Sequence, residues 1–161
     1  MKPAPSTRQS RVSQRGIALL IAMFAIVVLG AIVGGTFFAG WLEQQSGENT
    51  WFATQAAVGA DAGLADGLAT VPPASLSAMV PGGPPLLLPP MVLANGVTVQ
   101  RQAFRSGGNL FVLTARATRL NAGGAPLASA AAGLLVHLLA DSVSGEQTVV
   151  PLRDRAWVQL Y

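Results

Sequence analysis

The sequence predicts an α+β fold in which a long N-terminal helix packs on a small antiparallel β-sheet. An uncharged apolar run over residues 17–42 indicates a helix that spans a membrane, and the chain after it predicts an amphipathic continuation. Alternating apolar and polar residues on both sides of a Gly/Asn cluster near residue 107 indicate a β-hairpin. A proline-rich stretch separates these two parts of the chain.

Length and composition restrict the possible functions. The 161 residues suffice for one modest domain, and only 11% of them are charged, against about a quarter in ordinary soluble domains. The chain has no cysteine and one histidine, His137. A disulfide framework, thiolate metal sites and cysteine catalysis are therefore excluded, and His137 is the only candidate for histidine acid–base chemistry. Its apolar neighbours favour a structural or surface role, and we expect no catalytic residue, metal or cofactor.

The charges are segregated along the chain. Residues 1–16 carry four basic residues and no acidic one, residues 17–100 carry four acidic residues and no basic one, and residues 101–161 carry six arginines against three acids. The sequence pI near 10.6 therefore describes no single basic surface. We infer no nucleic-acid partner from it, and four arginines near the predicted hairpin are expected on a solvated sheet face: Arg101, Arg105, Arg116 and Arg119.

The apolar run of residues 17–42 is 26 residues long. As a helix it would extend roughly 39 Å at about 1.5 Å per residue, which exceeds the roughly 30 Å hydrocarbon core of a bilayer. The basic residues before it predict a cytoplasmic N-terminus. Gly30 and Gly34 would let another helix approach closely. A cleaved secretory signal is disfavoured by the length of the run, whereas an ordinary single-pass anchor fits equally well.

Residues 43–70 are expected to continue the helix beyond the membrane. Gly59, Gly63 and Gly67 recur every four residues and therefore lie along one face, next to a ridge that includes Leu64. Such a face can pack tightly on the chain's own sheet or on another subunit, and the sequence leaves both alternatives open.

Seven prolines lie within residues 71–96, which predicts an irregular connector that is partly polyproline-like. The small antiparallel domain is expected over residues 97–161. Its predicted hairpin joins residues 97–102 to residues 110–116, and a short strand is expected at residues 156–161. Residues 130–140 fit a strand or a helix by periodicity alone.

The junction of the basic leader and the apolar run resembles a known signal. Ser13-Gln14-Arg15-Gly16 is followed at once by Ile17-Ala18-Leu19-Leu20, which resembles a class III, prepilin-type leader. The resemblance implies cleavage between Gly16 and Ile17 by a membrane aspartic peptidase, methylation of the Ile17 amino group and retention of the apolar helix. The leader would then be residues 1–16.

The resemblance extends downstream to PilX-type minor pilins. The residues that carry it are Glu43, Asn49, Asp61, Gly63 and Leu64, the last three within the run Ala-Ala-Val-Gly-Ala-Asp-Ala-Gly-Leu. That family often has glutamate where this chain has Asp61. The resemblance implies a pilin-like antiparallel sheet after the helix, and so favours a strand at residues 130–140. Ile21 stands fifth in the mature chain, where major pilins usually have glutamate, which argues for a minor or tip subunit.

The expected function is therefore structural. A minor pilin-like subunit would lie in the bacterial inner membrane, with a cytoplasmic N-terminus and a periplasmic C-terminal domain, and would take part in type IV pilus assembly. Its partners would be other pilins and minor pilins, prepilin peptidase, the inner-membrane assembly platform and membrane lipid. The alternatives are a type II secretion pseudopilin and a generic single-pass protein with a small periplasmic binding domain.

Overall fold

The computed structural model describes residues 11–152 and 157–160, and the side chains of residues 16–152. The chain forms two compact units, Met1–Ser46 and Gly47–Tyr161. The first ten residues of the expected leader lie outside the described residues, as do the end residues of the expected C-terminal strand, Ala156 and Tyr161.

The long helix is α1, Arg11–Thr70, which contributes to both units. It contains no proline. It ends where Val71 precedes Pro72 and Pro73, because a residue before proline is disfavoured in helical conformation and proline has no amide hydrogen to donate. The Val71 amide still donates to the Gly67 carbonyl at 2.9 Å, which closes the last turn.

Residues 71–96 are more ordered than the sequence predicts. They form a one-turn helix, α2 (Pro73–Ser77), and a strand, β1 (Leu86–Val92), that pairs antiparallel with the next strand. The expectation of an irregular, partly polyproline-like connector is therefore wrong over residues 86–92. Pro89 and Pro90 fit because the pairing shifts register between Leu88 and Met91, and an edge-strand bulge is a place where a sheet tolerates proline.

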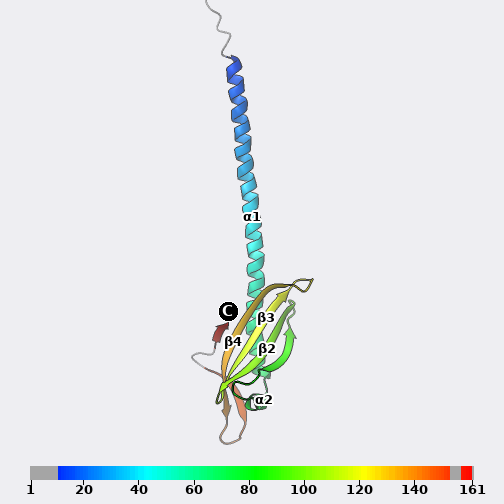
Figure 1. Cartoon of the computed structure of the whole chain (residues 1–161), viewed down its shortest axis with the longest axis vertical. Coiled ribbons are helices and arrows are strands. Elements are labelled where there is room, and N and C mark those ends of the chain that lie inside the picture. The colour runs from blue at the N-terminus through cyan, green and yellow to red at the C-terminus, as the bar shows by residue number, and fades with distance from the viewer. Residues whose placement is uncertain (1–10, 153–156, 161) are drawn as a thin grey trace, which may run out of the picture. The chain divides into compact units, whose positions relative to one another are not determined.

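The sheet is antiparallel throughout. Its strand order is β1-β2-β3-β4-β5, and β6 also pairs with β4 (Figure 1). The bounds of the remaining strands are β2 Val97–Gly107, β3 Leu110–Leu120, β4 Pro126–Ala140, β5 Gln147–Pro151 and β6 Trp157–Leu160. The predicted hairpin is confirmed as β2 and β3, and residues 130–140 are confirmed as a strand. The sequence analysis missed β5.

The second unit has two layers, with its part of α1 on one face of the sheet. Side chains alternate between buried and less buried positions along β2, β3 and β4, as they must when successive residues point to opposite faces. The inward side chains meet the helix and α2 in one core. The largest fully buried members of that core are Phe111, Leu64, Leu76, Leu113, Val97, Val99 and Val136. The predicted α+β fold and the amphipathic second half of the helix are thus confirmed.

An Asn-Gly turn sets the start of β2. Gly96 has a φ of +77°, a left-handed conformation that glycine adopts without steric cost. Its amide donates to the Leu93 carbonyl at 2.8 Å, and the Asn95 side chain accepts from the Val97 amide at 3.2 Å. The turn therefore starts β2 so that Val97 and Val99 point inward.

Candidate interaction surfaces

The predicted cleavage site lies at the exposed start of the described part of α1. Gly16 is helical and exposed, and no described residue outside its own turn of α1 lies within 4 Å of where its Cβ would be. Ile17 is 59% exposed. The bond between them is thus not covered by described residues of the chain.

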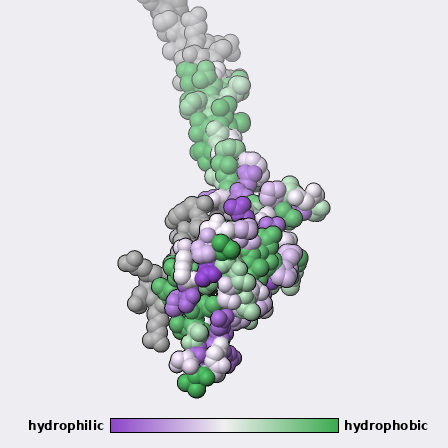
Figure 2. All heavy atoms as spheres, turned by 60° about the horizontal axis from the view of Figure 1, so that its bottom comes forward, coloured by the Kyte–Doolittle hydropathy of each residue, from purple (hydrophilic) through white to green (hydrophobic). Residues whose placement is uncertain are grey.

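Residues 17–42 of α1 expose an almost wholly apolar surface. Among the described residues, one helix is long and apolar enough to cross a membrane, Gly16–Thr70, and none of its most apolar window is buried. Figure 2 shows this surface as nearly continuous green. Gly30 and Gly34 have open space beside them, so another helix could approach their shared face closely. The segment is a candidate membrane span.

The three glycines Gly59, Gly63 and Gly67 of α1 serve a different contact. Each of them is buried under the sheet. A Cβ on Gly59 would lie 2.8 Å from Val97 Cγ1, and one on Gly63 would lie 2.5 Å from Val99 Cγ1. At Gly67 the nearest atom would be 3.6 Å away. The missing side chains let α1 approach β2 and β3 closely, so the small-residue face packs on the chain's own domain.

The residues that carry the resemblance to minor pilins divide between core and surface. Gly63 and Leu64 are buried against the sheet, and Leu64 is 1% exposed. Glu43, Asn49 and Asp61 are exposed. The structure therefore gives the first two a packing role and leaves the three polar residues on the surface of α1.

Arg101 is a buried cation on the inward face of β2. It is 8% exposed, and its guanidinium forms an ion pair with Asp66 of α1. A second guanidinium nitrogen donates to the Pro89 carbonyl at 2.8 Å, so the side chain also fills the bulge of β1. Such a pair costs desolvation, but removing one partner is expensive because it leaves the other charge buried and unpaired. Arg101 and Asp66 thus join helix, sheet and edge strand.

Arg105 fastens α2 to the hairpin. Its guanidinium donates to the Gly108 carbonyl at 2.7 and 2.9 Å and to the Ser77 carbonyl at 3.2 Å. It also lies 5.5 Å from the ring centre of Phe111, within the range of a cation–π contact. The expectation of a solvated arginine face is therefore wrong for Arg101 and Arg105, which are committed to contacts within the chain. Arg116 is exposed on β3.

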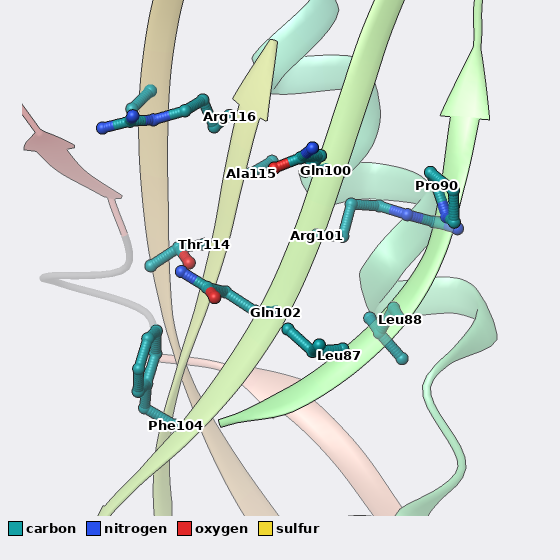
Figure 3. Close-up of a pocket in the computed structure, with 11 residues that line it drawn as sticks. Leu87, Leu88, Pro90, Gln100, Arg101, Gln102, Phe104, Thr114, Ala115 and Arg116 are labelled. Carbon is teal, nitrogen blue, oxygen red and sulfur yellow. The ribbon is translucent and has the colours of Figure 1, made fainter. Parts of the chain in front are cut away.

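A cavity of about 810 Å³ lies against the sheet. In Figure 3, Gln100, Gln102 and Phe104 extend from β2, Gln102 lies beside Thr114, and Arg101 reaches toward β1 at Pro90. The register places Gln102 opposite Thr114 and Gln100 opposite Arg116. We call this cavity the outer groove; its lining residues are Leu87, Leu88, Pro90, Gln100, Arg101, Gln102, Phe104, Thr114, Ala115, Arg116 and Ala131.

The outer groove combines apolar contacts with hydrogen-bonding groups. Leu87 is 73% exposed beside it, and the Thr114 hydroxyl is buried with no hydrogen-bond partner among the described residues. Its lining includes two arginines and no acidic residue, and Asp66 already neutralises Arg101. The groove therefore presents a positive charge that no acidic residue of its lining compensates, next to an apolar wall.

A second exposed surface lies on α1, on the side turned away from the glycines. We call it the outer helix stripe; it consists of Trp51, Thr54, Val58, Asp61 and Ala65. These residues recur at three- and four-residue intervals and so share one helix face. Trp51 and Val58 are both more than 60% exposed. The stripe is mainly apolar and carries one acidic side chain.

The described residues contain no group of three or more acidic, histidine or cysteine side chains that could hold a metal ion. His137 lies on the less buried face of β4, opposite Leu110. The pKa of the Asp141 carboxyl is lowered, because the Val143 amide and the Ser144 hydroxyl donate to its carboxylate. That carboxylate shapes the β4–β5 loop.

The sequence analysis did not identify Gln100, Gln102 or Thr114 as members of a site. The alternation along residues 97–102 predicts that the glutamines share one face, but their partners on β3 depend on the hairpin register.

Comparison with protein-family models, with curated protein sequences and with solved structures found no match to this chain. The structure alone therefore defines the class of protein: a small α+β domain on a chain whose long N-terminal helix is a candidate membrane span.

Proposed function

We propose that this chain is a non-enzymatic, minor pilin-like subunit of a type IV pilus assembly system. Residues 17–42 hold it in the inner membrane, its N-terminus lies in the cytoplasm and residues 43–161 lie in the periplasm. The observation that carries the proposal is α1 itself. Its first part is apolar and unburied, it follows a basic Ser-Gln-Arg-Gly junction directly, and its second part is built into the core of a small sheet domain.

The proposed mechanism is an exchange of lipid for neighbouring helices. An apolar helix satisfies its own backbone hydrogen bonds, so it is stable in lipid and equally stable against other apolar helices. Basic residues at its start favour the cytoplasmic side and hold the subunit at that depth. Cleavage between Gly16 and Ile17 by prepilin peptidase removes them, and the assembly platform can then move the helix into a bundle of pilins and minor pilins. Gly30 and Gly34 permit close contact there.

Ile21 supports a minor rather than a major subunit. A carboxylate five residues into the mature chain could neutralise the amino terminus of a neighbouring subunit in an apolar environment, and isoleucine cannot. A filament built from this chain alone would leave those amino groups unpaired, which is costly in low dielectric. The type II secretion pseudopilin is less well supported, because the described part of residues 97–161 joins its strands by short connections and has no large insertion of the kind typical of K-type pseudopilins.

Mass spectrometry of the full chain, purified from cells with an active prepilin peptidase, tests the proposal. We expect an N-terminus at Ile17 that carries one methyl group. Gly16→Leu should leave the leader in place, whereas Gly34→Ala, a glycine change inside the helix, should not affect cleavage. An intact leader in the wild-type protein would contradict the proposal, and so would survival of function after residues 17–42 are replaced by an unrelated membrane helix.

A further inference from the structure

We infer that the outer groove binds the C-terminal end of an extended polypeptide, one that ends in apolar residues and a free carboxylate. The inference starts from four polar side chains on the outer face of the sheet. The register places Gln100 opposite Arg116 and Gln102 opposite Thr114. Opposite residues lie about 5 Å apart and residues two apart along a strand about 7 Å apart. The four residues therefore form what we call the polar rectangle.

Each member of the polar rectangle can donate a hydrogen bond. The guanidinium of exposed Arg116 offers the planar fork that matches a carboxylate. The amides of Gln100 and Gln102 both donate and accept, as a peptide group does. The buried Thr114 hydroxyl has no hydrogen-bond partner among the described residues, and the Gln102 side chain lies beside it (Figure 3). Because buried polar groups are normally paired, this side of the groove is suited to a polar ligand group.

An apolar wall borders one side of the polar rectangle. Leu87 of β1 is 73% exposed and lies opposite Gln102. Half-buried Phe104 follows Gln102 by two residues on the same strand and therefore on the same face. Figure 3 shows Leu87 and Phe104 both near Gln102, whereas Arg116 lies at the other end of the groove. A matching ligand carries an apolar group at one end and a negative charge about 7 Å away.

The end of a polypeptide fits this pattern better than a lipid or a sugar. A fatty acid has a single polar group, so its hydrocarbon would cover Gln102 and Thr114 and leave them unpaired, which is costly. An acidic sugar has hydroxyl groups around its ring, and some of them would face Leu87 and Phe104. A peptide end has a carboxylate for Arg116, peptide groups for the glutamines and apolar side chains for the wall.

The size of the cavity agrees with this ligand. Its volume of about 810 Å³ lies within the range of about 300–1,000 Å³ that is usual for ligand pockets. The lining contains no acidic residue that would repel a carboxylate. The groove is built from residues 87–131 alone, and it uses neither the apolar helix nor the cleavage site. The inference therefore goes beyond the proposed function, and either can fail without the other.

Fluorescence polarisation with a labelled peptide tests the inference. The probe is fluorescein-Gly-Ser-Leu-Leu with a free carboxylate, added to the full chain in micelles of an uncharged detergent, and empty micelles correct for partitioning. We expect saturable binding. The same peptide with a C-terminal amide should bind at least about tenfold more weakly, a difference of about 1.4 kcal/mol. Fluorescein-Gly-Ser-Ser-Ser, which keeps the carboxylate and lacks the apolar side chains, should also bind more weakly.

Three variants assign the contacts. Arg116→Gln should weaken binding of the acid peptide and leave the amide peptide nearly unchanged, so that the preference for the acid disappears. Gln102→Leu should weaken both peptides by a similar factor of about three to ten. The matched control is Gln147→Leu, an exposed glutamine on β5 outside the groove, which should bind like the wild type. Circular dichroism checks that each variant is folded.

The inference is overturned if the folded wild type does not bind the acid peptide or binds the amide peptide equally well. It is also overturned if Arg116→Gln keeps the preference, or if Gln147→Leu loses as much binding as Gln102→Leu. Two unlabelled competitors decide the class of ligand. Glucuronate that displaces the probe as well as acetyl-Ser-Leu-Leu does would show a site for acidic sugars. Equal displacement by N-acetyl-leucine would show a site for a small metabolite, and either result contradicts a polypeptide ligand.

Discussion

The close packing of α1 on the sheet leads us to expect opposite effects on stability when alanine replaces two glycines on the same helix face, Gly63 and Gly67. In Gly63→Ala the new Cβ would lie 2.5 Å from Val99 Cγ1 and 3.2 Å from Ala115 Cβ, so the helix or β2 must move. In Gly67→Ala the new Cβ would meet only ordinary contacts, the nearest at 3.6 Å to Leu113. Both substitutions remove the same entropic disadvantage of glycine in a helix.

The magnitudes decide the sign at each position. Alanine favours a helix over glycine by about 0.8–1 kcal/mol, and forcing extra volume into a packed core costs about 1–3 kcal/mol. We therefore expect Gly67→Ala to stabilise the second unit by up to about 1 kcal/mol. Gly63→Ala should leave the unit unchanged or destabilise it by up to about 2 kcal/mol, since the two effects oppose each other.

Thermal unfolding of the full chain in detergent micelles, followed by the sheet signal in circular dichroism, measures both effects. At about 4 °C per kcal/mol for a domain of this size, the two variants should differ by several degrees. Val99→Ala removes the clashing methyl group, so Gly63→Ala should cost less in that background. Equal stabilisation by Gly63→Ala and Gly67→Ala would refute the argument that Gly63 is required for close packing.

Three further substitutions test other contacts. Asp66→Ala should destabilise the second unit by about 1–3 kcal/mol, because it leaves the Arg101 charge buried and unpaired. The same unfolding assay should show a smaller loss of stability when Asp66→Ala is combined with Arg101→Met. The pKa of Asp141 is lowered below 3.8 in the folded chain. The stabilising contribution of its carboxylate is therefore present above that pH and is lost as the pH falls through the folded-state pKa. The difference in melting temperature between the wild type and Asp141→Asn should shrink over the same pH range. Gly96→Ala should lower the free energy of unfolding by about 1–2 kcal/mol, because Gly96 has a φ of +77° and a side chain disfavours that conformation. The control Gly107→Ala places its side chain in open space at an ordinary φ, so this variant should melt close to the wild type.

Much of the architecture could be predicted because local patterns agree with it. The uncharged run, the four-residue glycine spacing and the Pro72–Pro73 stop together define α1, and the alternation around Gly108 and Asn109 defines the hairpin. The resemblance to pilins correctly favoured a strand over residues 130–140, where periodicity was ambiguous. These features depend on residues close together in sequence.

The remainder depends on contacts between distant residues. In the sequence, Pro89 and Pro90 argue against a strand. In the structure, a bulge of β1 accommodates them, and the Arg101 side chain fills this bulge. The pairing of Arg101 with Asp66 links positions 35 residues apart. An inward charge on β2 signals that a partner must exist, but it does not identify the partner. The outer groove is likewise a product of strand register.

The two prolines of β1 have a consequence for how copies can meet. An exposed strand edge is a template for adding another chain through backbone hydrogen bonds. Proline offers no amide hydrogen, and the bulge interrupts the spacing that an incoming strand would have to match. This border of the sheet is thus protected against runaway strand addition, the route to amyloid-like aggregation.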